Sequence, residues 1–331
     1  MMLDTLKTLL SVWGPTGQEG QVAQALQALL ADHVDDMRVD VMGNLIVTKK
    51  GRPGGKTLMF SAHMDHIGLV VTDIEDTGYL RVTNVGGVSV DGMRCRHVAF
   101  GNGVQGVAVC QPTKGETAGM QHLFVDIGAQ DKAEALTMVQ LGDACVYAPD
   151  CIPLGPHRYA APAMDDRCAC ALLVELLLQA DEPNNTIVGV FSVQEEVGLR
   201  GAATAAYQVA PDWGVAIDVT AWGDTPEVKL PAVQLGAGAA IKFMDRSMIA
   251  TPCVRDALIA AAERAGVPYQ REILPFGGTD GGAIQHSRGG VPTGTLSIPC
   301  RYVHSACETI DMRDMESGLA ILKELVGAAL A

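Results

Sequence analysis

The stretch Ser192-Val-Gln-Glu-Glu-Val-Gly-Leu-Arg-Gly-Ala202 follows an apolar, β-rich run, residues 186–193, and leads into a predicted helix. Two adjacent carboxylates, Glu195 and Glu196, therefore come just after a buried strand. In open α/β sheets, chemistry takes place outside the carboxyl ends of the strands. Because side chains alternate along an extended segment, one glutamate can bind a metal while the other acts on a water molecule. The competing interpretation is a solvated loop with two acids, which is the commoner meaning of an isolated Glu-Glu pair.

The composition limits the class of protein. The chain has 331 residues, of which 48% are hydrophobic and 5% aromatic, and it contains 37 glycines. This combination indicates a compact α/β protein with many tight turns, large enough for one large or two ordinary domains. The formal net charge of −14 argues against nucleic acid as a partner, because a phosphate backbone would be repelled.

The chain also lacks the signals of membrane insertion and secretion. No apolar run reaches the roughly 18 residues that span a bilayer, so we expect no membrane partner. The first ten residues have no basic start or cleavage site and predict an amphipathic helix. The nine cysteines are scattered, odd in number and mostly in apolar surroundings, unlike a disulfide framework. We therefore expect a cytoplasmic protein.

Two kinds of sequence pattern alternate along the chain. Helical and strand-like periodicities alternate in residues 1–67 and again in residues 154–331. Residues 68–153 instead carry short β-branched runs cut by glycine pairs, with helical periodicity only near residues 132–138. We predict an α/β domain formed by residues 1–67 and 154–331, and a small, mostly β domain inserted at residues 68–153.

Candidate metal ligands stand at or near the ends of successive apolar strands. They are His63 and Asp65 after the run 57–62, Glu195 and Glu196 after 186–193, Asp218 within 213–220, Asp165 and Asp166 before a predicted helix, and His304 in the loop after 292–298. Imidazole and carboxylate ligands together suit zinc or cobalt(II) better than calcium or magnesium, which favour sites made only of oxygen.

The size of this set predicts two metal ions rather than one. Five ligands are too many for one tetrahedral zinc that also keeps a water molecule, but they fit two ions, about 3.5–4 Å apart, that share a carboxylate. Such a pair lowers the pKa of a shared water and polarises the carbonyl under attack. A nearby carboxylate that binds no metal is still needed to move the proton of the water to the leaving group.

Each candidate also has a purely structural interpretation. A single histidine after a strand is commonly just a hydrogen-bonded structural group. Asp165-Asp166-Arg167 alone would favour an ordinary helix N-cap with a surface ion pair. Asp218 is the hardest to explain in this way, because a carboxylate within a buried strand is costly unless it is paired or coordinated.

Six ordered motifs resemble those of the M42 metallo-aminopeptidases. These are the tetrahedral or TET aminopeptidases, which include glutamyl aminopeptidases and proteins formerly labelled endoglucanases. The resemblance runs nearly from end to end, with Val85-Gly-Gly87 and Leu141-Gly-Asp143 as further matches in the insert. The six motifs are His63-Met-Asp-His-Ile-Gly68, Met164-Asp-Asp-Arg167, Val193-Gln-Glu-Glu-Val-Gly-Leu-Arg-Gly-Ala202, Ala216-Ile-Asp-Val-Thr220, Gly278-Thr-Asp280 and Arg301-Tyr-Val-His-Ser305.

The resemblance assigns roles that spacing leaves open. It implies that Asp165 bridges two divalent cations per subunit, Zn²⁺ or Co²⁺. The other ligands would be His63 and Asp218 for one ion, and Glu196 and His304 for the other. Glu195 would be the general base, and Asp65 would orient His63. The sequence departs from the family pattern at His66, where the family more often has glutamate, and this can alter the pocket beside the metals.

The resemblance also implies a fold and an activity. The fold would be an α/β exopeptidase domain of the phosphorylase/hydrolase-like type, with a mixed sheet and an inserted, small β-barrel-like dimerisation domain. The activity would be metal-dependent removal of N-terminal residues from short peptides, and the assembly a homo-oligomer of dimers forming a dodecamer. The alternatives are a di-metal deacylase or carboxypeptidase of related fold, and a non-catalytic assembly protein on the same scaffold.

Overall fold

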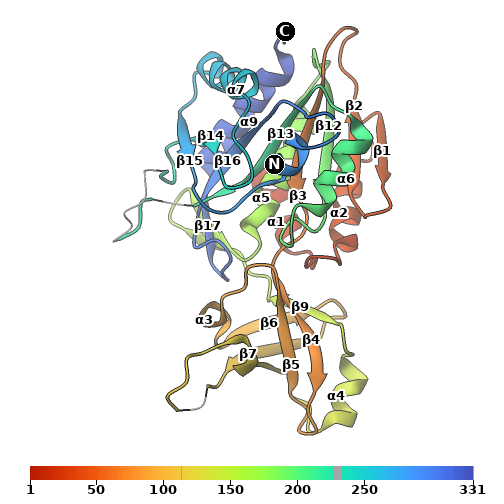
Figure 1. Ribbon diagram of the computed structural model, residues 1–331, viewed down its shortest axis with the longest axis vertical. Helices are drawn as coiled ribbons and strands as arrows, with labels where there is room; N and C mark the ends of the chain where they lie inside the picture. Colours follow the sequence, from red (N-terminus) through yellow and green to blue (C-terminus); the bar gives the residue numbers. More distant parts are fainter. Residues whose placement is uncertain (113, 222, 227–232, 331) are drawn as a thin grey trace.

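The strand that leads to the two glutamates, β12 (Thr186–Ser192), lies inside a large mixed sheet (Figure 1). The computed structural model describes residues 1–112, 114–221, 223–226 and 233–330. Within them the sheet has eleven strands, and its main path is β1-β2-β12-β3-β13-β16-β17-β11-β10. The strands are β1 (Asp36–Val39), β2 (Leu45–Lys49), β3 (Thr57–His63), β10 (Ile152–Leu154), β11 (Arg158–Ala161), β12, β13 (Trp213–Thr220), β16 (Thr293–Arg301) and β17 (Glu308–Asp311), with β14 (Ala239–Met244) and β15 (Tyr269–Ile273) branching from β16.

Four neighbouring strands of this sheet run parallel. They are β12, β3, β13 and β16, and the register places Ser192 beside His63 and Asp218 beside Ser297. These strands are buried, as their unbroken apolar runs predict for a parallel sheet that is covered on both faces. Their carboxyl ends therefore meet at one edge, which receives the polar residues that follow each strand.

Helices cover both faces of the sheet. One face carries α5 (Met164–Gln179), and around it pack α1 (Met2–Leu10), α2 (Gly20–Leu30), α7 (Pro252–Ala265) and α9 (Met312–Gly327). The other face carries α6 (Arg200–Val209) and α8 (Asp280–Gln285). Leu173 and Leu177 of α5 are fully buried, and each buried leucine contributes about 1.5–3 kcal/mol of hydrophobic stabilisation. This double cover holds the sheet edge rigid.

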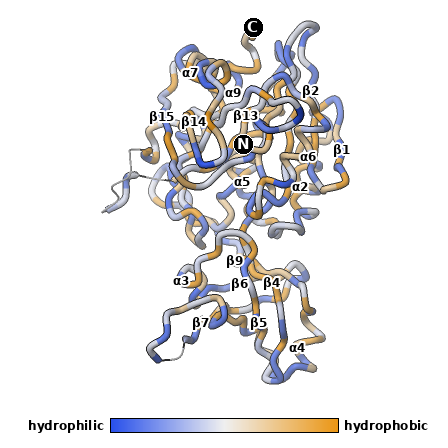
Figure 2. The backbone as a smooth tube through the Cα atoms, in the orientation of Figure 1, coloured by the Kyte–Doolittle hydropathy of each residue, from blue (hydrophilic) through white to orange (hydrophobic). Residues whose placement is uncertain are grey.

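A closed barrel lies between β3 and β10 in the chain and hangs below the sheet in Figure 1. Hydrophobic stretches mark both parts of the molecule in Figure 2, and the barrel has a core of its own that includes Leu69, Leu80 and Val125. Its order is β4 (Gly68–Ile74), β5 (Leu80–Val85), β8 (Leu123–Asp126), β7 (Gln105–Cys110), β6 (Arg96–Phe100) and β9 (Ala144–Tyr147), with the short helices α3 (Val90–Met93), η1 (Met120–His122) and α4 (Lys132–Met138).

The predicted class, an α/β fold with a mixed sheet and an inserted β barrel, is confirmed. The division at residues 67/68 and 153/154, and a role of the insert in dimerisation, remain predictions. Four strands of the described sheet were not predicted. Three of them, β10, β11 and β17, are only three or four residues long, and the fourth, β14, contains the buried Lys242. In the part of the chain that the structure describes, no helix is long and apolar enough to cross a membrane.

Candidate metal centre

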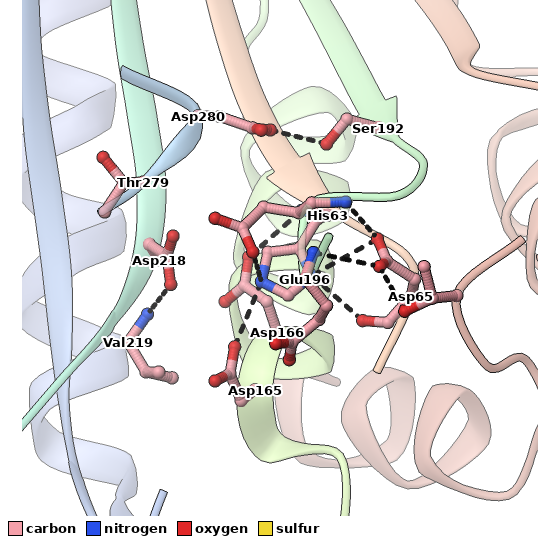
Figure 3. Close-up of polar contacts among 12 residues, drawn as sticks. His63, Asp65, Asp165, Asp166, Ser192, Glu196, Asp218, Val219, Thr279 and Asp280 are labelled. Atoms are coloured by element: carbon pink, nitrogen blue, oxygen red, sulfur yellow. Dashed lines mark hydrogen bonds and ion pairs between the residues drawn. The ribbon is translucent and has the colours of Figure 1, made fainter. Parts of the chain in front are cut away.

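Two strand ends and one helix start form the first cluster of possible ligands. His63 ends β3, Asp218 lies in β13, and Asp165 belongs to the first turn of α5. One ligand atom from each lies within 4.8 Å of the others. The imidazole Nε2 of His63 is 3.1 Å from Oδ1 of Asp165. Figure 3 shows these side chains facing one another at the sheet edge.

A second cluster shares Asp165 with the first. It adds Glu196 from the loop after β12 and His304 from the loop between β16 and β17. The Nε2 atom of His304 is 3.3 Å from Oδ2 of Asp165 and 3.2 Å from Oε2 of Glu196. The two carboxylate oxygens of Asp165 therefore face two different histidines, which is the geometry of a bridging ligand.

The start of α5 explains why Asp165 and Asp166 differ. Ala163 has a left-handed backbone with φ 62°, and both aspartates have non-helical angles, so the first turn is irregular. Asp166 turns to the strand and accepts a hydrogen bond from the backbone N–H of His63 at 3.2 Å. No side chain caps the helix, and Arg167 is buried, where it donates to backbone carbonyls of residues 9, 12 and 14. An N-cap with a surface ion pair is therefore not what this segment forms.

Glu195 stands beside the two clusters but belongs to neither. Its Oε2 lies 4.0 Å from Nε2 of His63, and its side chain is 12% exposed. The preceding Gln194 has a left-handed backbone with φ 55°, and Gly198 closes the loop by donating to the carbonyl of Glu195. This turn sends Glu196 to the ligand cluster and leaves the carboxylate of Glu195 facing the cavity.

The carboxylate of Asp65 holds the loop that carries the two glutamates. It accepts the backbone N–H of Glu195 at 3.0 Å and that of Glu196 at 3.3 Å. Its distance to Nδ1 of His63 is 3.7 Å, whereas the backbone carbonyl of Asp65 lies 2.9 Å from that nitrogen. The geometry thus allows Asp65 to orient His63 through the backbone carbonyl of Asp65, and to hold the loop of Glu195 and Glu196 through its side chain.

The buried carboxylates of the centre are only partly balanced by positively charged side chains. Burial raises the pKa of Asp218, of Glu195 and of Glu196, and neighbouring carboxylates raise each further. Burial lowers the pKa of His304, but the carboxylates of Asp165 and Glu196 outweigh it and raise that pKa to about 12. Burial also works against the charge of Asp165, yet His304 and His63 hold its pKa below the ordinary value.

The donor set fits divalent cations. Within the described residues, Oε1 of Glu196 is buried without a hydrogen-bond partner, although such atoms are normally satisfied. Both clusters combine imidazole nitrogen with carboxylate oxygen, the mixture that zinc and cobalt(II) accept. Residues and charge therefore agree with a centre that binds metal.

A cavity of about 700 Å³ opens over this centre. His63, Asp165, Glu195, Glu196, Asp218 and His304 line one side. The other described lining residues are mostly apolar. Among them, Arg246 is the only lysine or arginine. They are Leu199, Val219, Thr220, Ala221, Arg246, Ser247, Leu274, Phe276, Gly277, Gly278 and Val303. Apart from the acids of the centre itself, no carboxylate of the described residues lines this space.

The barrel also touches the centre. A Cβ atom added to Gly87 would lie 2.4 Å from Nδ1 of His304, and one added to Gly86 would lie 3.2 Å from Cβ of Glu196. Gly86 and Gly87 follow β5, so the corner of the inserted barrel packs directly on two candidate ligands. A side chain at residue 87 would therefore displace the imidazole of His304.

Three buried carboxylates near the centre escaped the sequence-based search. Glu308 accepts the backbone N–H groups of Asp165 and His304, Glu19 accepts those of Gly17 and Gln194, and Asp280 accepts the hydroxyls of Ser61 and Ser192. Of the three, only Asp280 stands in one of the ordered motifs, Gly278-Thr-Asp280. Their partners are backbone groups or serines, so no spacing of ligand residues could have revealed them.

The comparison with known families decides the family of this chain. The family of M42 glutamyl aminopeptidases matches residues 43–321. The chain belongs to the M42 family of aminopeptidases. The resemblance to the M42 family and the predicted enzyme class, a metal-dependent aminopeptidase, are thereby confirmed. Divalent metal ions are a property of this family, in agreement with the two ligand clusters.

Relatives of the M42 chain cover it almost completely. The lysyl aminopeptidase of Pyrococcus furiosus is 35% identical over 90% of this chain and 88% of its own. The structure of an aminopeptidase from Desulfurococcus kamchatkensis covers 99% of this chain and 95% of its own, with 36% identity and a TM-score of 0.96. The TET1 peptidase of Pyrococcus horikoshii, which can assemble into a tetrahedron or a large octahedral shell, has a TM-score of 0.90, 31% identity and coverage of 99% and 100%.

Proposed function

We propose that this M42 enzyme removes N-terminal residues from short peptides at a centre of two divalent cations. One cation would be held by His63, Asp165 and Asp218, and the other by Asp165, Glu196 and His304. The observation that carries the proposal is the position of Asp165, whose two oxygens face the two histidines of different clusters. Zn²⁺ or Co²⁺ suits this mixed set of nitrogen and oxygen donors.

The chain's own residues would divide the chemistry. When bound, two such cations supply Lewis-acid polarisation of the scissile carbonyl and acidify an attacking water. The carboxylate of Glu195 would take the proton from that water and deliver it to the departing amine. Its raised pKa, caused by burial and by the neighbouring acids Asp218 and Glu196, suits a group that must hold a proton between these steps. Asp65 would keep Glu195 in place through the backbone N–H.

The centre would also select the end of the substrate. A free α-amine could bind directly at the metal centre, whereas a blocked N-terminus offers no such amine. The candidate ligands and a largely apolar group of residues line the same cavity. A peptide would therefore place its first side chain against these apolar residues and its first carbonyl beside Glu195.

Assays with paired substrates test the proposal. We expect cleavage of peptides with a free N-terminus, no cleavage of the same peptides after N-acetylation, and loss of activity with a chelator that Zn²⁺ or Co²⁺ restores. Cleavage of blocked peptides alone would instead indicate a deacylase or carboxypeptidase. Activity on neither substrate, with metal bound, would favour a non-catalytic assembly protein.

We also infer that the chain forms a homo-oligomer, with dimers as the unit of a dodecamer. The support is the assembly of the TET1 relative, to which this chain is 31% identical over nearly its full length. The inserted barrel would be the dimerisation domain. Light scattering should give twelve times the mass of one chain, and a monomer would contradict the proposal. A place in the cytoplasm stays a prediction.

A further inference from the structure

Glu308 occupies an unusual position at the first residue of β17. Glu308 is only 2% exposed. Its strand, β17, pairs with β11, and Ala161 of β11 lies opposite Glu308. Oε2 accepts the backbone N–H of Asp165 at 3.0 Å, and Oε1 accepts the backbone N–H of His304 at 2.7 Å. One carboxylate thus joins two candidate ligands that come from different elements.

Both of these backbone N–H groups lie in irregular segments. His304 has a left-handed backbone with φ 63°, and Tyr302 two residues earlier has φ 59°. Asp165 lies in the non-helical start of α5, where the regular helix bonds are interrupted. A non-glycine residue with positive φ is strained and needs its surroundings to hold it. Glu308 supplies this support to both segments at once.

Other roles for Glu308 do not fit its contacts. Both oxygens face backbone N–H groups, and neither candidate ligand cluster includes the residue. It is absent from the described lining of the cavity, so it is not placed to touch a substrate. Among the described residues, no lysine or arginine lies within ion-pair distance of Glu308. The two backbone hydrogen bonds and His304 favour its charged form against burial and the nearby Asp165, which together raise its pKa to about 8.

We propose that Glu308 is a positioning residue that fixes Asp165 and His304 relative to each other and thereby sets the metal affinity of the cluster they form with Glu196. This inference rests on the proposed function, because it takes those three residues as ligands. Groups that orient metal ligands typically change metal affinity by about 10–100-fold when they are replaced. The ligand side chains themselves remain in the variant, so metal binding should weaken rather than disappear.

The test is a titration of the metal-free protein with CoCl₂, followed by visible absorption of the bound Co²⁺. In Glu308→Gln, one amide oxygen can still accept, but the amide NH₂ meets the second backbone N–H as another donor. We expect two Co²⁺ equivalents in the unchanged protein and, in Glu308→Gln, about 10–100-fold weaker binding of one equivalent with an altered spectrum. The rise in melting temperature on adding CoCl₂ should shrink in parallel.

Asp314→Asn is the matched control. Asp314 is also buried, and it also accepts two backbone N–H groups, those of Gly236 and Gly238, each at 2.7 Å. It contacts no candidate ligand, so its replacement should lower the melting temperature without changing the cobalt titration. A variant of this kind separates loss of metal geometry from general loss of stability.

The outcomes distinguish this inference from the proposed function. If the unchanged protein binds no Co²⁺, both fail. If it binds two equivalents and Glu308→Gln binds them equally well, or if Asp314→Asn weakens binding to the same degree, only the role of Glu308 is refuted. If Glu308→Gln does not fold, Glu308→Asp replaces it in the test, because the shorter aspartate side chain cannot reach both N–H groups. We expect Glu308→Asp to bind one Co²⁺ equivalent at least about tenfold more weakly. Unchanged affinity would refute the role of Glu308.

Discussion

At the scale of single residues, the centre works by giving similar side chains different surroundings. Glu195 and Glu196 are neighbours in the chain, yet the left-handed Gln194 and the turn at Gly198 send them to different places. Oε2 of Glu196 lies 3.2 Å from Nε2 of His304, while Glu195 remains outside both ligand clusters. A metal ligand and a general base can therefore stand side by side.

Replacing Glu195 by glutamine should separate binding from turnover. The amide keeps the size of the side chain but cannot accept the proton of the attacking water, so kcat should fall by about 10²–10⁴-fold. The Co²⁺ content should stay the same, because Glu195 belongs to neither ligand cluster. Steady-state kinetics and metal analysis on the same sample check both parts. Unchanged kcat would refute the role of Glu195 as base.

Arg246 should influence which N-terminal residue is accepted. Arg246 is the only lysine or arginine among the described residues of a largely apolar wall. Its positive charge should repel a substrate with N-terminal lysine, so substrates with an apolar N-terminal side chain should be preferred. A charge contact near water is worth about 1 kcal/mol, or roughly fivefold. Arg246→Glu should therefore raise kcat/KM for lysyl relative to leucyl substrates by about fivefold or more.

The control for Arg246 is Arg288→Glu, the same change of charge at an exposed arginine outside the described cavity lining. It should leave the lysyl-to-leucyl ratio unaltered. If both variants shift the ratio equally, the overall charge of the protein and not the cavity wall controls the preference.

At the scale of secondary-structure elements, the segment from β16 to α9 carries much of the order around the centre. His304 lies in its loop, Glu308 begins β17, and Asp311 ends β17 and caps α9 by accepting the N–H of Arg313 at 3.1 Å. Asp311 also accepts from the guanidinium groups of Arg158 and Arg313. A four-residue strand is thus anchored at both ends by buried carboxylates.

The ion pairs of Asp311 predict a stability change in acid. Although burial works against its charge, Arg313 and Arg158 lower the pKa of Asp311 to about 2, below its unfolded value. This contribution to stability is present above about pH 4 and is lost as the pH falls toward 2. In Asp311→Asn the cap can remain while the charge is lost, so the melting temperature should fall near pH 7 and approach that of the unchanged protein near pH 2.

The size of this effect should be on the order of 1 kcal/mol at pH 7. Thermal unfolding of both proteins across pH 2–7 measures it as a gap that closes with acidification. A gap that stays constant over this range would show that the charge of Asp311 does not stabilise the fold.

At the scale of the whole molecule, the inserted barrel and the α/β part meet at the candidate metal centre. The corner Gly86-Gly87 follows barrel strand β5 and packs on His304 and Glu196. The barrel is therefore part of the wall of the centre as well as a candidate for subunit contacts. Its position relative to the sheet should affect catalysis.

Adding one methyl group at this junction tests that connection. In Gly87→Ala, the new Cβ would lie 2.4 Å from Nδ1 of His304, so the imidazole must move. Displacements of about 1 Å in an active site can reduce rates by about 10²-fold, and we expect kcat/KM to fall to a similar degree. Gly92→Ala in the same barrel, with no atom closer than 3.3 Å to the new Cβ, should retain activity. Full activity of Gly87→Ala would mean that the barrel does not constrain His304.

The sequence by itself determined the α/β class, the barrel insert and the list of ligand types. Apolar strands ending in His63 or followed by Glu195 and Glu196 predict a polar sheet edge, because parallel strands end together. The ordered motifs add the family and the choice of Asp165 over Asp166. These features depend on residue type and on short-range spacing, which can be read along the chain.

Only the tertiary structure decided how the candidate ligands are held. Glu308 and Asp65 act on backbone N–H groups, and a backbone N–H has no residue-specific signature in a sequence. Whether it is free depends on the left-handed angles at His304 and Gln194 and on the irregular start of α5. The packing of Gly87 on His304 likewise depends on where the barrel packs against the sheet, since that contact joins parts of the chain with two separate hydrophobic cores.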